Sequence, residues 1–375
     1  MPKIKTILVV GGGVAGLTTA AALHRRGFTV ELVERQQSWH APGAGFLVHA
    51  NGMRMLRSLD LAAGVENAGA IIRRWQFCNE QGNVLSETDL ESLWGDAGPC
   101  VGIERAKLQR ALLPGVGNVR CRLATSVTSL EQDDRRVSVT FSDRSTGDYD
   151  LVVGADGIRS TIRALTLTSA APADLSAMNW RSIAPIRPAS LSALQLYLGD
   201  GCVFGLVPMG AGRTYGFAYV VQPRFHDPLE GRLERLRNRF ATFGPRVQEY
   251  LASLEHDDQV ICSVMEWWKF EKSYTGRAVL VGDAAHASSP MMGQGGCMAM
   301  EDACALANEL CAAATIEIAL ASYVRRRTPR VKWVQQQSMA LAEILTGPSA
   351  VRNATLRERG HEAMQARFGP LVPAP

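Results

Sequence analysis

The sequence predicts an α/β fold, α+β overall, in which a βαβ lobe is interleaved with a mostly antiparallel lobe. Residues 3–34 run as a hydrophobic strand, a glycine turn, a helix and a second strand, which is the order of a parallel βαβ unit. Residues 178–268 instead form short alternating segments, which is typical of an antiparallel sheet. Helical segments then follow to the end of the chain. We therefore expect two interleaved lobes and a set of C-terminal helices.

The composition is that of an ordinary globular protein and excludes several classes of function. The chain has 375 residues, enough for two lobes, of which 46% are hydrophobic and 20% are charged. The net charge of +4 is spread along the chain, whereas nucleic-acid binding usually needs a concentrated basic face. The eight cysteines show no C-x-x-C pair and no zinc spacing, so we expect reduced thiols and no metal site.

No segment indicates a membrane or a secretory signal. No apolar run approaches the roughly 20 residues that a membrane span needs, and Met1 leads directly into the first hydrophobic strand. We therefore expect a cytoplasmic protein with no membrane association.

The first glycine turn carries the pattern G-x-G-x-x-G at Gly11, Gly13 and Gly16. In this pattern the first glycine permits a tight turn, the second lets a pyrophosphate approach the backbone, and the third lets the helix pack closely on the strand. Glu34 lies 18 residues beyond Gly16, at the end of the second strand, where a carboxylate can accept hydrogen bonds from a ribose. The motif indicates a Rossmann-like dinucleotide site; that the glycines serve packing alone remains the alternative.

Hydrophobic spacing and turn residues place the other elements of the first lobe and a β-excursion within residues 70–98. The expected strands are Ile4–Val10, Phe28–Glu34, Ile72–Cys78, Val84–Thr88, Arg120–Leu130, Arg136–Phe141 and Tyr149–Val153, and the expected helices are Val14–Arg26, Asn51–Leu59 and Ile103–Leu113.

The small-residue stretch Ser169–Ala177 marks a crossing into the second lobe. There we expect one helix, Leu229–Tyr250, among several strands, and residues 277–283 return to the first lobe as a strand. The expected strands of this lobe are Asn179–Ile186, Ala193–Leu198, Val203–Val207 and Thr214–Val221, and the expected C-terminal helices are Gly296–Ala314, Ile316–Ala342 and Ala350–Arg367.

Three hydrophobic strands, each more than a hundred residues from the next, end in glycine, and two of these glycines lead into an acid. These ends lie at Val10-Gly11, at residues 153–157 and at residues 281–283. Open α/β sheets bind ligands at the carboxyl ends of their strands. We therefore expect the three ends to converge on one cofactor.

These three segments resemble a known family, the single-component FAD-dependent aromatic hydroxylases with the para-hydroxybenzoate hydroxylase fold. The carriers are Gly11–Gly16 with Glu34-Arg35, the "DG" segment Gly154–Arg163, and the "GD" segment Gly282–His286, which continues through residues 290–297 to Glu301-Asp302-Ala303. The resemblance spans about residues 4–340 and is closest to the compact branch of salicylate, 3-hydroxybenzoate, 6-hydroxynicotinate and urate hydroxylases and tetracycline-inactivating monooxygenases.

The resemblance implies three groups of segments. Residues 1–70, 99–172 and 270–345 would form the FAD-binding domain. Residues 71–98 and 173–269 would form the substrate-binding domain. Residues 346–375 would form a C-terminal helix and tail.

The resemblance also implies FAD-binding residues. Asp283 would accept hydrogen bonds from the ribityl chain, Arg105 and Gln109 would reach the phosphate or flavin side, and the N–H groups at the helix start near Cys297 would face the flavin. Simpler alternatives are a helix cap for Asp283, a surface position for Arg105, a plain turn at Asp156 and, for Cys297, a reactive thiol. The implied set is Gly11, Gly13, Val14, Ala15, Gly16, Glu34, Arg35, Gly45, Arg105, Gln109, Val127, Asp156, Gly282, Asp283, Gly295, Gly296 and Cys297.

Candidate substrate-site residues lie mainly in the second lobe. Tyr215 could orient or deprotonate a phenol-like group, and Arg181 could pair with a substrate carboxylate, although packing or a rim salt bridge remains open for each. Pro290 and Gly293 would lie on the flavin side, and His49, His226 and His286 are expected to be structural or solvated. Further pocket candidates are Trp180, Tyr197, Phe204 and Phe217.

The implied activity is a monooxygenase that takes electrons from NAD(P)H and uses dioxygen to hydroxylate an aromatic, polyketide or heteroaromatic molecule through a flavin C4a-hydroperoxide. The sequence has no second G-x-G-x-x-G, so NAD(P)H would dock transiently, and the protein would be a monomer or homodimer. Two alternatives remain: a reductase, dehydrogenase or epoxidase on the same scaffold, and a non-catalytic protein that binds a flavin or an aromatic ligand.

Overall fold

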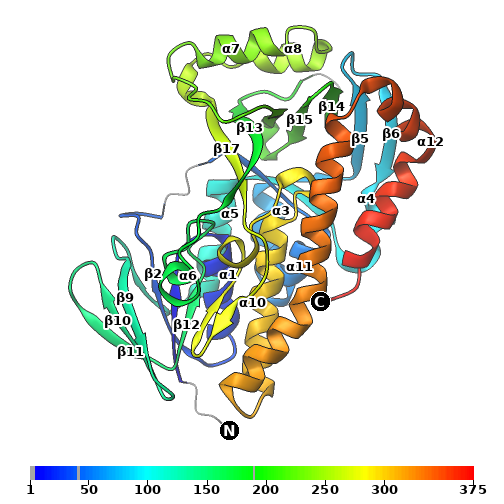
Figure 1. Cartoon of the computed structure of the whole chain (residues 1–375). Helices are drawn as coiled ribbons and strands as arrows, with labels where there is room; N and C mark the ends of the chain where they lie inside the picture. The colour runs from blue at the N-terminus through cyan, green and yellow to red at the C-terminus, as the bar shows by residue number, and fades with distance from the viewer. Residues whose placement is uncertain (1–4, 40–42, 189–190) are drawn as a thin grey trace.

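A six-stranded sheet lies at the centre of the first lobe, in the computed structural model that describes residues 5–39, 43–188 and 191–375 (Figure 1). Its order is β18-β19-β12-β1-β2-β8, and all neighbours are parallel except the edge strand β18. The strands are β1 (Thr6–Val10), β2 (Thr29–Val33), β8 (Arg120–Arg122), β12 (Leu151–Gly154), β18 (Tyr274–Thr275) and β19 (Ala278–Leu280).

The register of this sheet brings the three glycine-ended strands together, as the sequence predicts. Val10 at the end of β1 pairs with Gly154 of β12, and Gly154 pairs with Leu280 of β19. Three distant parts of the chain therefore end side by side at one edge of the sheet.

Both faces of this sheet are covered. One face packs against helices α1 and α10, and the other packs against α6 and a small antiparallel sheet of order β11-β10-β9. These elements are α1 (Val14–His24), α6 (Thr161–Thr166), α10 (Gly295–Ala312), β9 (Val127–Gln132), β10 (Val137–Phe141) and β11 (Thr146–Tyr149).

A seven-stranded sheet forms the second lobe, with the order β17-β13-β16-β15-β14-β5-β6. Strands β5 and β6 come from the excursion near residues 70–98, and β5 joins β14 in parallel. The sheet consists of β5 (Arg74–Asn79), β6 (Val84–Asp89), β13 (Ala173–Ala184), β14 (Leu194–Gly199), β15 (Cys202–Pro208), β16 (Thr214–Val221) and β17 (Ile261–Trp267).

Helices cover both faces of the seven-stranded sheet. Helices α7 and α8 lie on one face, at the top of Figure 1, and the long α11 and the C-terminal α12 lie towards the other face. Their bounds are α7 (Arg232–Arg239), α8 (Pro245–Ala252), α11 (Ile316–Thr346) and α12 (Ser349–Phe368).

A three-stranded sheet of order β3-β7-β4 and several short helices complete the described structure. These are β3 (Gly45–Val48), β4 (Ala70–Ile72), β7 (Cys100–Glu104), α2 (Ala50–Ser58), α3 (Ala62–Ala68), α4 (Leu90–Trp94), α5 (Arg105–Leu112), α9 (Asp283–His286), and the 3₁₀ helices η1 (Gly95–Ala97), η2 (Leu113–Val116), η3 (Gly210–Gly212), η4 (Asp257–Gln259), η5 (Pro290–Met292) and η6 (Gly369–Leu371).

Buried charges join α10 to α11. Arg327 Nη1 lies 2.5 Å from Glu301 Oε2, and Arg327 Nε lies 2.7 Å from Asp302 Oδ1, with all three side chains almost completely buried. Arg330 Nη2 adds a second pairing to Glu301 at 2.7 Å. Arg327 and Arg330 are therefore drawn inside the protein, because two acids of α10 need partners there.

Three sequence expectations about elements are wrong. The helix expected at 229–250 is two helices, because α7 ends at Arg239 and a new helix, α8, begins at Pro245, a residue suited to the first position of a helix. The strand expected at 120–130 is split between β8 and β9, which belong to different sheets. Ile103, expected on a helix, lies in β7.

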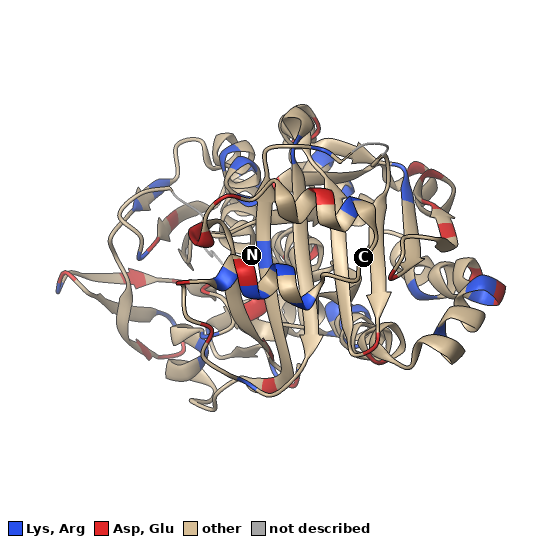
Figure 2. Ribbon diagram, turned by 90° about the horizontal axis from the view of Figure 1, so that it is seen from above, with Lys and Arg blue, Asp and Glu red and all other residues tan. Residues whose placement is uncertain are grey.

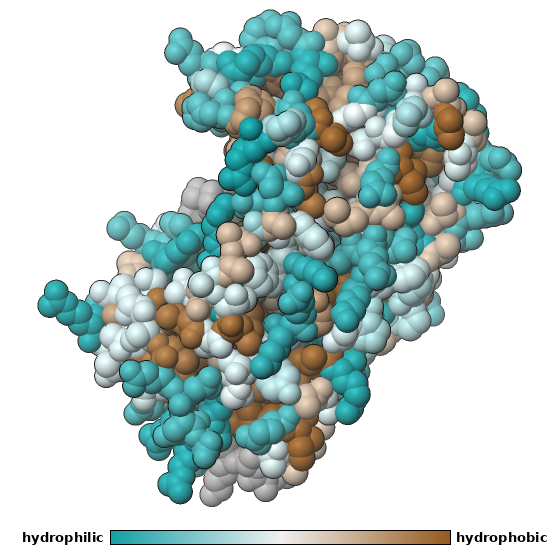
Figure 3. All heavy atoms as spheres, viewed as in Figure 1, coloured by the Kyte–Doolittle hydropathy of each residue, from teal (hydrophilic) through white to brown (hydrophobic). Residues whose placement is uncertain are grey.

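Surface charge and hydropathy agree with the composition. Figure 2 shows basic and acidic residues interleaved around the ribbon, and Figure 3 shows a largely hydrophilic face with small scattered hydrophobic groups. Among the described residues, every helix is too short or too polar to traverse a bilayer.

Candidate active site

The three motif glycines of the first loop have different surroundings. A Cβ on Gly16 would lie 1.7 Å from the Gly11 carbonyl oxygen, and Gly11 has a φ of +110°, so packing and backbone geometry require both. Gly13 has no heavy atom within 4 Å of an added Cβ, and its φ is −77°. Packing therefore explains two of the glycines but not Gly13, whose backbone borders open space.

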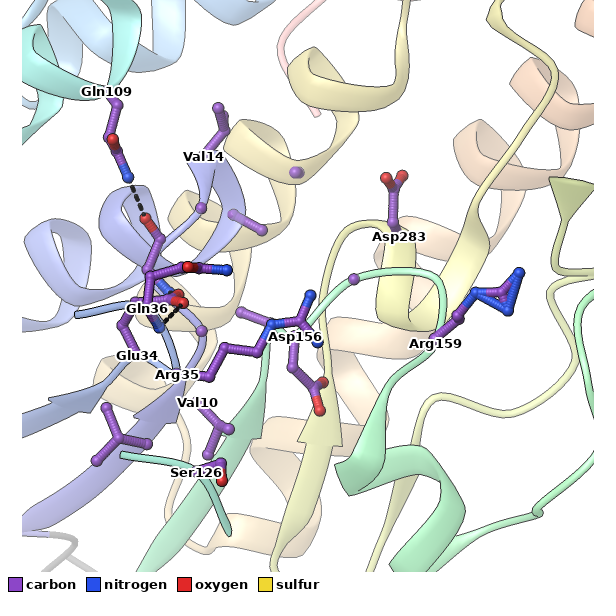
Figure 4. Close-up of a pocket in the computed structure, with 18 of the residues that line it drawn as sticks. Val10, Val14, Glu34, Arg35, Gln36, Gln109, Ser126, Asp156, Arg159 and Asp283 are labelled. Atoms are coloured by element: carbon purple, nitrogen blue, oxygen red, sulfur yellow. Dashed lines mark hydrogen bonds between the residues drawn. The ribbon is translucent and has the colours of Figure 1, made fainter. Parts of the chain in front are cut away.

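Side chains hold the glycine loop in place. Glu34 Oε2 accepts a hydrogen bond from Gly12 N at 2.6 Å, and Glu34 Oε1 accepts one from Gln36 N at 2.8 Å. Gln109 Nε2 donates to the Gly12 carbonyl at 3.0 Å (Figure 4). A carboxylate oxygen has two lone pairs, so Glu34 can also accept from a ligand hydroxyl. The loop is thus shaped before any ligand arrives.

A cavity of about 430 Å³ lies beside this loop and gathers most of the predicted cofactor residues. The predicted residues that line it are Gly11, Gly13, Val14, Ala15, Glu34, Arg35, Arg105, Gln109, Val127, Asp156, Asp283, Gly295 and Gly296.

Four predicted cofactor residues do not line this cavity. Gly16 packs behind Gly11, Gly45 lines the neighbouring cavity, and Cys297 is fully buried. Gly282, with a φ of +59°, packs against Ala15.

Sequence reasoning missed several residues that line this cavity. Gln36, Phe46, Thr125 and Ser126 are among them. All four lie within two residues of a predicted cofactor residue. Their closeness in the sequence to those residues is the feature that could have identified them.

The two acids at the strand ends differ in their bonding. Asp156 is half-buried and accepts from Ser160 Oγ at 2.5 Å and from Ile162 N at 3.1 Å, and desolvation raises the pKa of Asp156 above its ordinary value. Among the described residues, the Asp283 side chain has no hydrogen-bond partner, and it does not cap α9. Figure 4 shows its carboxylate across the cavity from the glycine loop. Asp156 therefore organises the start of α6, while Asp283 is available to a ligand.

Arg105 lies where this cavity meets a second one. Its side chain is exposed to the two cavities, and partial desolvation lowers the pKa of Arg105 from its ordinary value, with Asp283 acting in the opposite direction. Among the described residues, no carboxylate lies within ion-pair distance of Arg105, so the guanidinium is available to a ligand.

Helix α10 directs its N-terminus at the same place. The helix has 18 residues, no acid in its first turn and no side-chain cap on its first N–H groups. An added Cβ on Gly296 would lie 2.0 Å from the Phe46 ring, so Phe46 lies directly on the helix start. Free N–H groups and the helix dipole favour negative charge at this point.

The thiol of Cys297 does not suit a reactive role. Cys297 is fully buried, its sulfur accepts from His49 N at 3.3 Å, and burial raises the pKa of its thiol to about 12. The thiol therefore stays protonated near neutral pH, which contradicts the reactive-thiol alternative.

The second cavity, of about 410 Å³, lies between the first cavity and the seven-stranded sheet. The two cavities share Phe46, Arg105, Asp283, Gly295 and Gly296. Among the substrate-site candidates, those that line the second cavity are Arg181, Tyr215, Phe217, Pro290 and Gly293.

Three other substrate-site candidates lie on the wrong face of the sheet. Trp180 donates through Nε1 to Asp227 at 2.9 Å, and Tyr197 and Phe204 are buried in the core beneath α7 and α8. Successive side chains of a strand point to opposite faces, so Trp180 faces away from the cavity that its neighbour Arg181 lines. These three predictions are wrong.

Tyr215 and Arg181 are polar groups of this cavity. Burial raises the pKa of Tyr215 to about 12, although Arg181 and Arg105 act in the opposite direction. At neutral pH Tyr215 is therefore a neutral phenol suited to donating a hydrogen bond. Arg181 Nη2 donates to Ser263 Oγ at 3.1 Å, and Arg181 Nε is buried with no partner.

The histidines serve structure, as the sequence predicts for His49 and His286. His49 is completely buried, stacks on Trp75 and Phe368, and touches Gly293. Burial lowers the pKa of His49 to about 4, with a backbone hydrogen bond at Met292 acting in the opposite direction. His286 Nε2 is hydrogen-bonded to Asp302 at 2.5 Å.

The observed features fit FAD. Gly13 leaves its backbone open, Arg105 lacks a protein anion, Asp283 is free, and an uncapped helix start faces the junction of the two cavities. Among the described residues, no cluster of histidine, cysteine and acids could hold a metal ion.

Comparisons with known proteins agree with this fit. A family model described as "FAD binding domain" matches residues 4–338. The chain is 31% identical over 372 residues to "Aurachin C monooxygenase/isomerase" of Stigmatella aurantiaca, covering 96% of each chain. It is 30% identical over 354 residues to "2-heptyl-3-hydroxy-4(1H)-quinolone synthase" of Pseudomonas aeruginosa, covering 90% of this chain and 89% of the relative.

A solved structure is also similar over nearly the whole chain. Klebsiella pneumoniae HpxO, solved with FAD and uric acid, has a TM-score of 0.90 and 26% identity, covering 99% of this chain and 97% of HpxO.

The open surroundings of Gly13 generate a first prediction. Gly13→Ala should leave the unfolding free energy of the apoprotein within about 0.5 kcal/mol, because no protein atom meets the new methyl group. The same methyl group should weaken FAD binding at least about tenfold, because it enters the space beside the loop. The measurement is a fluorescence titration of apoprotein with FAD.

The matched control for Gly13 is Gly369→Ala. Gly369 also has no neighbour within 4 Å and has a helical backbone, but it does not line either cavity. An unchanged FAD affinity in Gly13→Ala would show that the loop does not approach the cofactor.

The buried His49 generates a prediction about pH. Its pKa falls from 6.5 in the unfolded chain to about 4 in the fold, so its contribution to stability is intact above pH 6.5 and declines as the pH falls towards 4. Between pH 6.5 and 5 this single group should cost about 2 kcal/mol. Urea denaturation of the apoprotein at several pH values measures the decline.

His49→Asn should flatten that pH dependence, whereas a substitution of the exposed His361 to Asn should not. Equal pH slopes in the parent protein and His49→Asn would contradict the assignment.

Proposed function

We propose, from the premise that this chain belongs to the FAD binding domain family and is an FAD-dependent monooxygenase, that it hydroxylates a small aromatic or heteroaromatic molecule. NAD(P)H would be the electron donor and dioxygen the oxidant. The similar proteins include HpxO, solved with uric acid, and a relative named as a quinolone synthase, which supports a planar ring as the substrate.

One observation carries this proposal: the two cavities meet at Phe46, Arg105, Asp283 and the start of α10. The first cavity has the groups that bind a dinucleotide, and the second has a mixture of polar and apolar walls. A ligand in the second cavity would therefore lie next to the reactive end of a cofactor held in the first.

The residues of the first cavity would bind FAD and hold it in position. The glycine loop and the first N–H groups of α1 would hold the pyrophosphate, and Glu34 the ribose. When bound, FAD supplies the redox chemistry, taking two electrons from NAD(P)H and passing one oxygen atom of dioxygen to the substrate. The uncapped start of α10 would stabilise negative charge on the cofactor ring.

The second cavity would position the substrate and exclude water. Arg181 would donate to an acceptor or anionic group of the substrate, and Tyr215 would donate a hydrogen bond from its neutral hydroxyl. Pro290 and Gly293 belong to the turn around η5 that borders the cavity, and this turn would set the distance between substrate and cofactor. Apolar walls around the reacting atoms would keep stray water out.

NAD(P)H would dock only transiently, because the described part of the chain has no second glycine-rich dinucleotide loop. We further propose a cytoplasmic monomer or homodimer that acts on a free small molecule, with no nucleic-acid or membrane partner.

The test is turnover of the purified yellow protein with NADH or NADPH, a panel of planar phenols and heterocycles, and ¹⁸O-labelled dioxygen. A product heavier by one labelled oxygen atom supports hydroxylation. Oxidation of NAD(P)H that a substrate stimulates without oxygen insertion would indicate a reductase or dehydrogenase. If FAD binds but is not reduced under any condition, a non-catalytic binding protein is indicated.

Tyr215→Phe should lower kcat/KM about 10- to 100-fold while FAD content is unchanged, because it removes only the hydroxyl that would orient the substrate. The matched control is Tyr219→Phe, on the same strand and the same face but outside the second cavity. Steady-state kinetics with a hydroxylated substrate measure both variants. Equal kcat/KM in Tyr215→Phe and the parent protein would remove Tyr215 from the site.

A further inference from the structure

The wall that the seven-stranded sheet gives to the second cavity changes from polar to apolar across the sheet. Directly opposed residues on neighbouring antiparallel strands share a face. One such row runs from Arg181 on β13 through Phe217 on β16 and Gly205 on β15 to Leu196 on β14. A single row of the sheet therefore leads from a cation to an aliphatic side chain.

The β13 and β17 end of this wall holds polar groups that lack partners. Arg181 has no carboxylate within ion-pair distance among the described residues, and its Nε is buried without a hydrogen bond. Asn179, which is 5% exposed, also has its Oδ1 buried without a partner. Ser263 lies opposite Asn179 on β17 and accepts a hydrogen bond from Arg181. Buried polar groups are normally satisfied, so this end is suited to a polar group of a ligand.

The β14 and β5 end is apolar. Leu194 pairs with Trp75 across these two strands, and Val207 lies opposite Tyr215 on the neighbouring pair. Leu47 and Met291 line the cavity as well, from outside the sheet. Among Leu194, Trp75, Val207, Leu47 and Met291, the only side-chain nitrogen or oxygen is Trp75 Nε1, which is buried and has no hydrogen-bond partner among the described residues.

Phe217 lies at the boundary between the two ends. A Cβ on Gly205 would fall 2.2 Å from the Phe217 ring, so the ring occupies the space beside this glycine. A planar ring of a ligand can stack on or beside Phe217 while touching Arg181 on one side and Leu196 on the other.

We propose, resting on the proposed function above, that the substrate is an amphiphile: a planar ring with a hydrogen-bonding edge and an extended aliphatic substituent. The polar edge binds at Arg181 and Asn179, and the aliphatic substituent lies along Leu196, Leu194, Val207 and Trp75. A small ring that is polar all round would leave this aliphatic wall against water, and a pure hydrocarbon would leave Arg181 desolvated without a partner.

The experiment titrates the purified FAD-loaded protein, without NAD(P)H, with 4(1H)-quinolones that carry a methyl, propyl, pentyl or heptyl group at carbon 2. Perturbation of the flavin absorbance reports binding. Each methylene that reaches the aliphatic wall should lower Kd about fourfold, so the heptyl compound should bind at least about 30-fold more tightly than the methyl compound. Uric acid, a planar ring without an aliphatic group, is the comparator and should bind more weakly than the heptyl compound.

Two variants separate the ends of the cavity. Leu196→Gln should reduce the methyl-to-heptyl ratio of Kd values several-fold while the methyl compound binds nearly as before, a pattern that partial unfolding cannot produce. Arg181→Met should weaken every quinolone by a similar factor and leave the dependence on chain length unchanged. FAD content and melting temperature confirm that each variant is folded.

A Kd that varies less than threefold over the series would overturn the proposal, as would tighter binding of uric acid than of the heptyl compound. If a ring without an aliphatic chain gives oxygen-labelled product and Kd does not change with chain length, the proposal of an amphiphilic substrate fails. The proposed monooxygenase function would still stand. If the series shows the expected slope but no ring compound gains oxygen in turnover, the binding inference stands and the proposed function fails.

Discussion

The structure depends on a buried charge cluster in which Arg327 of α11 pairs with both Glu301 and Asp302 of α10. Asp302 also accepts from Gly282 N at 2.9 Å and bonds His286, so the same carboxylate fixes the turn that follows β19. Burial alone would raise the pKa of Asp302, but His286 and Arg327 lower it to about 2. Replacing such a cluster by apolar residues can preserve stability, so its value lies in position: it fixes the start of α10 relative to the sheet end.

The position of the start of α10 determines which charge the site can bind. Glu301 accepts from Asn51 Nδ2 at 2.9 Å, and the same nitrogen donates to Gln294 at 2.9 Å, which ties α2 and the residue before α10 into the cluster. The acids of α10 thus lie deep in the helix, paired with arginines, and none stands in its first turn. The helix start can therefore present positive potential to a cofactor although the helix carries two buried acids.

The sequence was most informative where chemistry restricts residue type at fixed spacing. A tight turn requires glycine at Gly11, and the close contact of helix and strand requires glycine at Gly16. Asp283 follows a glycine-ended strand, and its side chain lines the first cavity. The sequence was least informative about which face of a strand a residue occupies. The sequence suggests Trp180, Tyr197 and Phe204 for the cavity because they are aromatic. However, neighbouring residues of a strand point to opposite faces of the sheet, so an error of one position places a side chain on the wrong face. Phe46 carried no motif, and only the fold shows that its ring lies on Gly296 at the junction of the cavities.

The C-terminal segment extends the site beyond the region that the family model matches. Residues 4–338 match the model, yet Phe368 of α12 stacks on His49 with ring centroids 5.3 Å apart, and His49 in turn touches Gly293. Arg54 and Arg330 bind carbonyl oxygens of the last residues, so the tail is fixed to α2 and to the charge cluster. A neutral His49 is required here because a charged imidazole would be desolvated among Trp75, Trp94 and Phe368. The turn that borders the second cavity is consequently backed by the far end of the chain, and sequence changes in α12 can alter that cavity without touching a ligand.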